Sequence, residues 1–357
     1  MALIYIDGFD TYATADITLR WSFAPGANSG MAKAIESSGG RNGTGCIALT
    51  FPAALTGQMS RSLGGSRSSV VVGVAVKLNS LANGITGVFL SLFEGSNHQV
   101  WLATNTVGDL ILGSGSSIIT TYGAGFTTGV WYYVELKVTI SNSIAADSCI
   151  VRVNGTTVIN PAAGTNLRQA STTASVDSVA IGGRGNWATT NSVILRYDDL
   201  YTLDNSGSMN NDLLGDIRVE AIRPSGNGSS TQFTPVGAAN NWDCVDEAAE
   251  DGDTSYVASS TVGQEDLYAI GDLVSTPANV FAVQVCAIGR KDDAGSRTIT
   301  SAIKSGGSVY DHGSVKTLGL GDTYSTLIDV WELDPNGNVA WTGSSVNAME
   351  AGVKLVG

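Results

Sequence analysis

Short apolar runs with a period of two, separated by Gly, Ser and Asn turns, restrict most strongly what this chain can fold into. Residues 130–140 show the pattern best, because every second position from 132 to 140 is almost wholly apolar while the positions between include Glu135 and Lys137. This alternation is typical of a strand with one face in a core and one face toward water. Before residue 205 the sequence has no apolar stripe of helical period and helical length. It therefore predicts an all-β fold, with Glu135 and Lys137 as an exposed pair.

The number of runs in the first half predicts a jelly-roll sandwich. Asn154 and Gly155 form a two-residue connection between two runs, which is the strongest short-range signal for a hairpin turn. Eight or more short strands connected by hairpins suit a sandwich or barrel, and this count suits a jelly roll. The runs are residues 70–78, 87–93, 99–103, 109–112, 130–140, 148–153, 157–159, 177–181 and 193–197.

A stretch of turn residues without periodicity, 204–211, separates the two halves of the chain. The second half is of ordinary domain size. It predicts a second β-sandwich, smaller than the first. We expect a jelly-roll domain over residues 1–204, a linker over 205–214 and an acidic β-sandwich domain over 215–357.

The second half also predicts one short helix near the C-terminus, over residues 342–351. Val346 and Met349 would lie on its buried face, and Gly352 would end it. The predicted strands of this half are residues 216–222, 268–270, 280–288, 297–303, 325–331 and 353–356.

The charge of the chain excludes one class of function and supports the division into halves. The net charge is −13, which argues against a nucleic-acid-binding protein because such proteins neutralise phosphates. Residues 1–205 hold 11 basic and 12 acidic residues, a net charge of −1, whereas residues 206–357 hold 8 basic and 20 acidic residues, a net charge of −12. The composition, 43% hydrophobic and 14% charged, excludes a disordered chain.

The cysteines and the N-terminus carry little functional signal. The four cysteines are far apart and form no Cys-x-x-Cys pair, so we expect buried free thiols, with a disulfide or metal site as the alternative. The start of the chain lacks a basic segment followed by an apolar one, which predicts no signal peptide. No run approaches the ~18 apolar residues that a membrane span needs. The cysteines are Cys46, Cys149, Cys244 and Cys286.

Four runs in the first half resemble the concanavalin A-like lectin/glucanase (laminin G-like) superfamily. They comprise an aromatic-led strand, an Asn-Gly hairpin, a Gly-ending strand and a late Asp-Asp-Leu strand, in that order. The resemblance covers most of residues 1–204 and implies a concanavalin A-like jelly roll. The superfamily contains enzymes, lectins and structural modules, so function does not follow from the fold. The runs are residues 129–138, 151–156, 177–183 and 197–201.

The opening segment, residues 4–12, is similar to the N-terminus of concanavalin A-like proteins of tailed-bacteriophage virions. Runs in the second half resemble a β domain of phage structural proteins. Together these resemblances imply a virion structural protein, located in the virion and made in the host cytoplasm. The second-half runs are residues 215–220, 254–263, 294–299 and 331–335, followed by Trp341-Thr342.

The sequence offers little for catalysis. Glycanases of the concanavalin A-like fold carry a Glu-x-Asp-x-x-Glu strand, and here the corresponding strand has Glu135 alone. His98 and His312 are the only histidines, and His98 is interpreted as a loop residue. A Ser-His-Asp triad with Asp311 and His312 is formally possible, but the chain lacks a Gly-x-Ser-x-Gly elbow between a strand and a helix. We therefore expect no enzymatic activity.

A Gly-rich loop over residues 182–191 is the candidate carbohydrate-binding site. It presents Arg184, Asn186 and Trp187, which are residue types that stack on sugar rings or bond to hydroxyls. The alternative is that Trp187 caps the core or packs on a neighbouring subunit.

An acidic segment, residues 243–253, is the candidate metal site. Oxygen-rich loops with a Gly turn bind Ca²⁺, although the spacing here differs from an EF-hand loop, and a solvated acidic loop is the alternative. The resemblance to concanavalin A-like domains implies a Ca²⁺-supporting role for an acid at Asp198 or Asp199, and the alternative is that these residues cap a strand end. We expect no other cofactor. The candidate ligands are Asp243, Asp246, Glu247, Asp251 and Asp253.

These observations lead to one functional expectation. The chain is expected to be a non-enzymatic structural component of a phage virion, located in the tail tip or fibre. It is expected to assemble by protein–protein contacts as a homo-oligomer, and the expected oligomer is a trimer. The alternatives are a capsid decoration protein and a lectin-like module that binds host glycans. Neither nucleic acid nor membrane insertion is expected.

Overall fold

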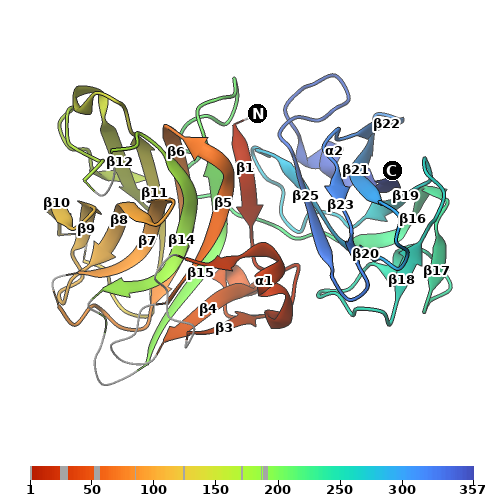
Figure 1. Cartoon of the computed structure of the whole chain (residues 1–357), viewed down its shortest axis with the longest axis horizontal. Helices are drawn as coiled ribbons and strands as arrows, with labels where there is room; N and C mark the ends of the chain where they lie inside the picture. The colour runs from red at the N-terminus through yellow and green to blue at the C-terminus, as the bar shows by residue number, and fades with distance from the viewer. Residues whose placement is uncertain are drawn as a thin grey trace. The chain divides into compact units, whose positions relative to one another are not determined.

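The computed structural model describes residues 2–24, 31–51, 57–84, 86–123, 125–169, 172–185, 187 and 192–357. The chain divides into two compact units, each of them built from β-strands (Figure 1). The first unit contains Met1–Asp10 and Thr14–Val219, and the second contains Thr11–Ala13 and Glu220–Gly357.

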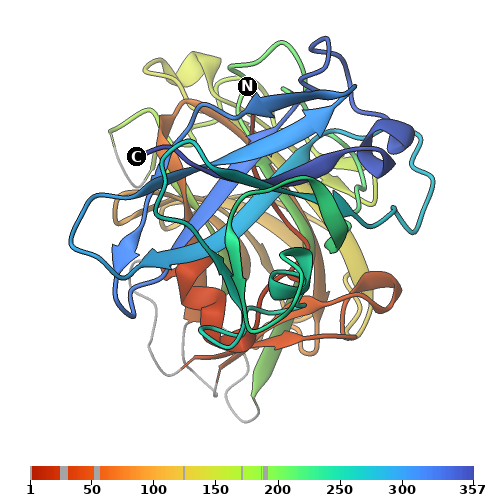
Figure 2. The same ribbon diagram turned by 90° about the vertical axis from the view of Figure 1, so that its right-hand side faces the viewer.

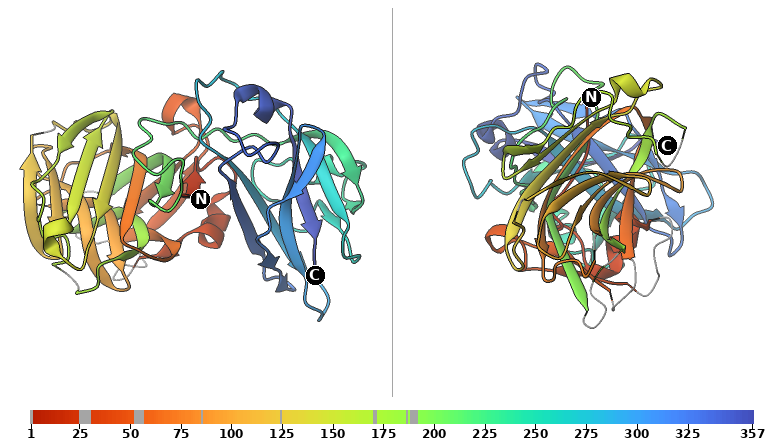
Figure 3. Two further views of the ribbon diagram at one scale, coloured as in Figure 1. Left: turned by 90° about the horizontal axis from the view of Figure 1, so that it is seen from above. Right: turned by 90° about the vertical axis from the view of Figure 1, so that its left-hand side faces the viewer.

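The first unit is a jelly-roll sandwich of two sheets, seen from two further directions in Figure 3. An eight-stranded sheet has the order β13-β12-β11-β6-β15-β4-β3, with β1 paired to β15. Its strands are β1 (Leu3–Asp7), β3 (Ala32–Glu36), β4 (Cys46–Phe51), β6 (Ser69–Leu78), β11 (Trp131–Thr139), β12 (Ser148–Val153), β13 (Thr156–Ile159) and β15 (Val193–Leu203).

The second sheet of this unit is seven-stranded, with the order β10-β9-β8-β7-β14-β5-β2. Its strands are β2 (Ser22–Phe23), β5 (Gly57–Arg67), β7 (Gly87–Glu94), β8 (Asn97–Thr104), β9 (Leu110–Ser114), β10 (Ser117–Tyr122) and β14 (Val176–Gly185). The unit also has one four-residue helix, α1 (Ile17–Arg20), and short 3₁₀ turns at Thr14–Asp16, Arg41–Gly43 and Ile144–Ala146.

Local sequence explains how the two sheets form and pack. Asn154 and Gly155 have φ of +48° and +78°, the left-handed values of a two-residue hairpin turn, and they connect β12 to β13 as the sequence predicts. Tyr197 on β15 joins the two sheets, because its hydroxyl donates to the Phe89 carbonyl at 2.7 Å and accepts from the Gly182 N–H at 2.9 Å. The apolar faces of both sheets therefore share one buried core.

Residues 205–219, which we call the belt, fold back onto the eight-stranded sheet. Glu135 on β11 is only 1% exposed, and its Oε1 accepts from the Tyr201 hydroxyl at 2.6 Å and from the Gly215 N–H at 2.8 Å. Lys137 lies 2.8 Å from Asp212 in the belt. The expectation of an exposed Glu135–Lys137 pair is wrong for Glu135, because the belt covers this part of the sheet.

Asp199 and Arg41 fix the far end of the belt. Asp199 accepts from the Val219 N–H at 2.8 Å and from the Arg41 guanidinium at 3.0 Å, and the same guanidinium reaches Asp216 at 2.6 Å. Asp198 accepts from the Arg41 and Asp199 N–H groups. Burial raises the pKa of both adjacent carboxyls. The Asp-Asp pair therefore lies at an irregularity within β15 and not at a strand end as expected, and it holds a segment distant in the sequence.

The second unit is a smaller β-sandwich (Figure 2). Its larger sheet has the order β16-β19-β26-β21-β22, with β23 paired to β21, and its smaller sheet has the order β24-β20-β25. The strands are β16 (Pro224–Thr231), β17 (Thr234–Val236), β18 (Tyr256–Ala258), β19 (Glu265–Ile270), β20 (Val283–Lys291), β21 (Thr298–Ser305), β22 (Ser308–Asp311), β23 (Lys316–Thr317), β24 (Gly319–Leu320), β25 (Ser325–Trp331) and β26 (Glu350–Leu355), with β17 and β18 forming a separate pair.

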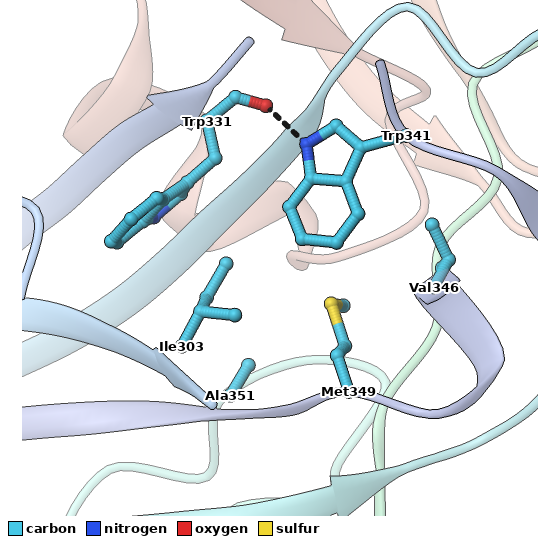
Figure 4. Packing of buried hydrophobic residues seen from close by; sticks show 6 residues of the cluster. All are labelled: Ile303, Trp331, Trp341, Val346, Met349 and Ala351. Atoms are coloured by element: carbon cyan, nitrogen blue, oxygen red, sulfur yellow. Dashed lines mark hydrogen bonds between the residues drawn. The ribbon is translucent and has the colours of Figure 1, made fainter. Parts of the chain in front are cut away.

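Two tryptophans and the short C-terminal helix, α2 (Gly343–Asn347), form one core of the second unit (Figure 4). The indole N–H of Trp341 donates to the Trp331 carbonyl at 2.8 Å. The helix begins with a capping box, in which the Thr342 side chain accepts from the Ser345 N–H. The buried members of this core are Ile303, Trp331, Trp341, Val346, Met349 and Ala351.

Two elements of the second half differ from the sequence-based expectation. Residues 204–223, all of them described, form no strand, so the strand predicted over 216–222 is wrong. The helix predicted over 342–351 spans only Gly343–Asn347, because pairing with β19 and β21 draws the chain into β26 from Glu350 onward. Gly352 lies inside that strand, where a Cβ would stand 1.9 Å from the Asp266 carbonyl oxygen.

All four cysteines are free thiols, as expected, and Cys46, Cys149 and Cys244 are buried. Burial raises the pKa of the Cys46 thiol to about 12. Among the described residues, no helix has the length and hydrophobicity to cross a membrane.

Candidate functional site

A polar cluster with two aromatic rings lies on one face of the seven-stranded sheet. The apolar alternate residues of β7 and β8, such as Leu90, Leu92 and Leu102, form the face that joins the core. The opposite face of the same strands carries Ser91 and Trp101, which are paired across β7 and β8. Phe93 and His98 are paired in the same way on that face. We call this cluster, together with Gln58 and Arg184, the His98 face.

A chain of hydrogen bonds orients the imidazole of His98. The Gln58 amide on β5 donates to Ser91 Oγ at 2.9 Å, and Ser91 Oγ lies 2.8 Å from His98 Nε2. The serine hydroxyl has one proton and two lone pairs, so it accepts from Gln58 and either donates to Nε2 or accepts from it. Either neutral tautomer of His98 completes this chain of hydrogen bonds.

The surroundings also keep His98 uncharged. Burial, followed by the positive charge of Arg184, lowers the pKa of His98 to about 3. The imidazole stacks between Phe93, with ring centroids 5.1 Å apart, and Trp101, at 6.0 Å. The Arg184 guanidinium lies 5.9 Å from the centroid of Phe93. His98 is therefore a neutral, oriented ring beside a cation.

The arrangement has the chemistry of a site for an acidic saccharide. A guanidinium offers a planar fork of N–H donors that matches a carboxylate. A neutral imidazole exchanges hydrogen bonds with hydroxyl groups at physiological pH. Arg184 and His98 are both half-buried, so they are the members of the cluster that face solvent. Gln58 and Ser91 lie beneath them, with exposures of 2% and 0%.

The structure separates the three predicted carbohydrate-binding residues. Arg184 belongs to the His98 face, whereas Asn186 lies outside the described residues. Trp187 is 2% exposed, its indole N–H donates to the Val88 carbonyl at 3.1 Å, and its ring meets Phe51 edge-on. Of the two interpretations of Trp187, packing in the core is the one that this burial fits.

Sequence reasoning missed Gln58, Ser91 and His98 as a group. The interpretation of His98 as a loop residue is wrong, since it lies within β8. The available signal was Ser91, a hydroxyl inside the otherwise apolar run 87–93. The register that brings Ser91 to His98 is a long-range property that no local pattern shows.

The acidic segment of the second unit is engaged in hydrogen bonds and an ion pair. Asp253 forms a bidentate pair with Arg290 and accepts from Tyr324. The Ser255 hydroxyl oxygen lies 2.8 Å from a Glu247 oxygen and 2.9 Å from an Asp251 oxygen, and its single proton is shared between them. Asp246 is half-buried beside the 3₁₀ turn that contains Asp243. Across the described part of the chain, no group of three His, Cys, Asp or Glu side chains is arranged to hold a metal ion.

The second histidine forms a separate cluster in the second unit. His312 Nδ1 lies 2.8 Å from Ser314 Oγ and 3.3 Å from Asp329 Oδ1, and its Nε2 is 3.0 Å from the Val330 carbonyl. Asp311, the acid proposed for a triad, pairs with Lys354 instead. Because Nε2 meets a backbone carbonyl, this histidine is held as a structural donor.

We expect His312 to titrate above the ordinary histidine range. The bond to Asp329 raises the pKa of His312, and the same bond, with those from Ser314 and Ser301, lowers the pKa of Asp329 against the effect of burial. The stabilisation is fully present below the unfolded histidine pKa of ~6.5 and is lost as the pH rises through the folded value; for Asp329 it is lost as the pH falls through its own folded value. NMR titration should show a raised pKa for His312 that falls in Asp329→Asn. An unchanged value in that variant would contradict the pairing.

Comparisons with known proteins find likeness to solved structures, at low sequence identity. No protein-family model matches the chain, and no curated protein matches it. Among solved structures, the cellulose-induced protein Cip1 is 15% identical with a TM-score of 0.43 and covers 56% of this chain and 96% of its own. The alginate lyase Aly36B is 15% identical with a TM-score of 0.40 and the same coverage. The alginate lyase vAL-1 from Chlorella virus is 11% identical with a TM-score of 0.38 and covers 54% of this chain and 96% of its own.

The expectation that the chain has no enzymatic activity is corrected by this comparison. Several of the similar solved structures are alginate lyases, so the jelly-roll fold found here is one on which catalysis occurs. At these identities the likeness concerns the fold, and it does not transfer their reaction to this chain.

Proposed function

We propose that the chain is a structural component of a tailed-phage virion whose jelly-roll unit binds an acidic saccharide at the His98 face. The single observation that carries the binding proposal is the oriented, neutral His98 beside the Arg184 guanidinium. The virion location is supported by the resemblance of residues 4–12 and of the second-half runs to phage proteins. The tail tip or fibre is the first location we propose, and capsid decoration is the second.

Particle composition tests the virion proposal. Mass spectrometry of purified particles is expected to detect the chain at a fixed copy number, and labelling with an antibody is expected to mark the tail. A fixed copy number on the head would favour decoration, and absence from purified particles would sink the virion role. We also propose a homo-oligomer, for which sedimentation of the isolated chain gives the subunit number.

Calorimetric titration with an oligomer of uronic acid tests the binding proposal. Arg184→Gln is expected to weaken binding at least about tenfold, because a charge-assisted pair is lost. Arg168→Gln is the matched control, since that guanidinium bonds to the Thr172 and Asn142 carbonyls in a loop of the same unit. Equal affinities of the wild type and Arg184→Gln would contradict the proposal. A melting temperature for each variant separates loss of binding from loss of folding.

A second candidate function is cleavage of the same saccharide by elimination. The observation that favours it is that His98 holds an unprotonated nitrogen beside a cation. With Nε2–H donating to Ser91, His98 Nδ1 would take the proton from the carbon next to a uronate carboxylate that Arg184 neutralises. The proton would pass to the neighbouring glycosidic oxygen as its bond to the sugar breaks and a C=C bond forms. The C=C bond of the unsaturated product is conjugated with the carboxylate and absorbs in the far ultraviolet. Absorbance that rises with wild type and not with His98→Ala would support cleavage, and no rise with either would leave binding alone.

A further inference from the structure

An open depression lies on the eight-stranded sheet of the first unit, on strands that the His98 face does not use. Its volume is about 390 Å³, within the ~300–1,000 Å³ typical of ligand pockets. It is lined by Glu36, Gly39, Lys77, Leu78, Asn79, Gly129 and Arg196.

The register of the sheet brings the charged lining residues together. Lys77 on β6 is directly opposite Arg196 on β15 and, on its other side, opposite Trp131 on β11. Arg196 is in turn opposite Ala48 on β4, a small residue that leaves room above the sheet. Directly opposed side chains on one face lie about 4.5–5.5 Å apart at Cβ. Glu36, at the end of the next strand, completes the group.

Each charged group in the depression is held in place. The guanidinium of Arg196 forms a two-point pair with Glu36, at 2.7 and 3.0 Å. The Lys77 ammonium donates to the Gly39 carbonyl at 3.3 Å and lies 4.7 Å from the centroid of Trp131. These contacts fix both cations, and one positive charge remains unbalanced because two cations face one carboxylate.

Hydrogen-bond donors and hydrogen-bond acceptors surround the Lys77 ammonium and the Arg196 guanidinium. The Asn79 side-chain oxygen accepts from the Ile194 N–H at 2.6 Å, which leaves its nitrogen as a donor. Glu36 Oε2 accepts from Arg196 and from the Cys46 thiol, whereas Oε1 accepts from Arg196 and has a second lone pair that accepts from a hydroxyl. This combination of excess positive charge with donors and acceptors matches a sugar that carries one anionic group.

We propose that this depression is a second site for an acidic saccharide unit, independent of the His98 face. The anionic group, a carboxylate or a phosphate, lies against Lys77 and Arg196. The sugar hydroxyls bond to Glu36 and Asn79. The site binds one monosaccharide unit, because the sheet positions all of its polar groups within one small depression.

The test observes the Trp131 indole N–H by NMR during titration with glucuronate, with glucose as the neutral match. The signal is assigned from Trp131→Phe. Glucuronate is expected to shift it saturably, and glucose is expected to bind at least about tenfold more weakly. Lys77→Gln should weaken glucuronate binding by a similar factor. Lys33→Gln is the control, because Lys33 is paired with the core residue Leu49 on the other face of β3.

One further variant and one further ligand complete the NMR titration. Glu36→Gln is expected to strengthen glucuronate binding several-fold, because it removes the one acidic residue that lines the depression and frees the guanidinium of Arg196 for the ligand. If the Glu36–Arg196 ion pair were merely structural, the substitution would not increase the affinity for glucuronate. Glucose 6-phosphate in place of glucuronate shows which anionic group is preferred, and binding of either one supports the site. Equal affinity for glucose and glucuronate, no saturable shift, or a Lys77→Gln variant that binds as well as wild type would overturn it. These outcomes do not depend on His98 or Arg184.

Discussion

Replacing Trp187 with alanine is expected to lower the free energy of unfolding of the first unit by about 3–5 kcal/mol. The indole is 2% exposed, is in edge contact with Phe51 and donates to the Val88 carbonyl. Gly87 has no side chain beneath the ring, and a Cβ there would stand 3.0 Å from it. The substitution therefore leaves a large cavity and removes one hydrogen bond from the buried Val88 carbonyl.

Urea unfolding followed by circular dichroism measures this loss. Trp131→Ala is the matched control, because Trp131 is half-buried on the surface of a sheet and its loss is expected to cost about 1 kcal/mol. A cost for Trp187→Ala as small as that of the control would show that Trp187 is an exposed platform. The carbohydrate interpretation of Trp187 would then be restored.

Replacing Asp199 with alanine is expected to cost about 3–5 kcal/mol and to release the belt. The carboxylate pairs with Arg41 at 3.0 Å and accepts the Val219 N–H, so both partners lose a buried acceptor. Asp199 also has a φ of +50°, which alanine adopts less readily than aspartate or asparagine. Asp199→Asn keeps the backbone preference and one acceptor, so about half the cost is expected.

Limited trypsin digestion reports on the belt directly. Cleavage after Arg218, which lies inside the belt, should become faster in Asp199→Ala than in the wild type, with Asp199→Asn between them. Unfolding free energies that agree within about 0.5 kcal/mol for all three proteins, with unchanged cleavage, would contradict the role of this acid.

Most strands were predictable because alternation is a local property. The runs over 70–78, 130–140 and 325–331 correspond closely to β6, β11 and β25. The strand expected over 216–222 failed because its polar backbone is satisfied by side chains from distant parts of the chain. The Ile217 carbonyl, for example, accepts from Arg41 at 3.2 Å. Such pairings have no signature in the local sequence.

The candidate site was less predictable than the fold for the same reason. Arg184 was identified from a segment predicted as a loop, although it lies within β14. Ser91 and His98 belong to different strands and meet only through the register of β7 with β8. Gln58 reaches Ser91 from a third strand. Glu135 illustrates the reverse error, because its strand pattern indicates an exposed face and only the belt explains its burial.

The central claim, that the His98 face binds an acidic saccharide, is tested most directly by NMR with ¹³C-labelled histidine. The chain contains only His98 and His312, so two ring signals are expected and the second is an internal control in the other unit. We predict that a uronic acid oligomer shifts the ring signal of His98 saturably and leaves the ring signal of His312 unchanged. A His98 signal that does not move at millimolar oligomer, or moves only together with His312, would contradict it.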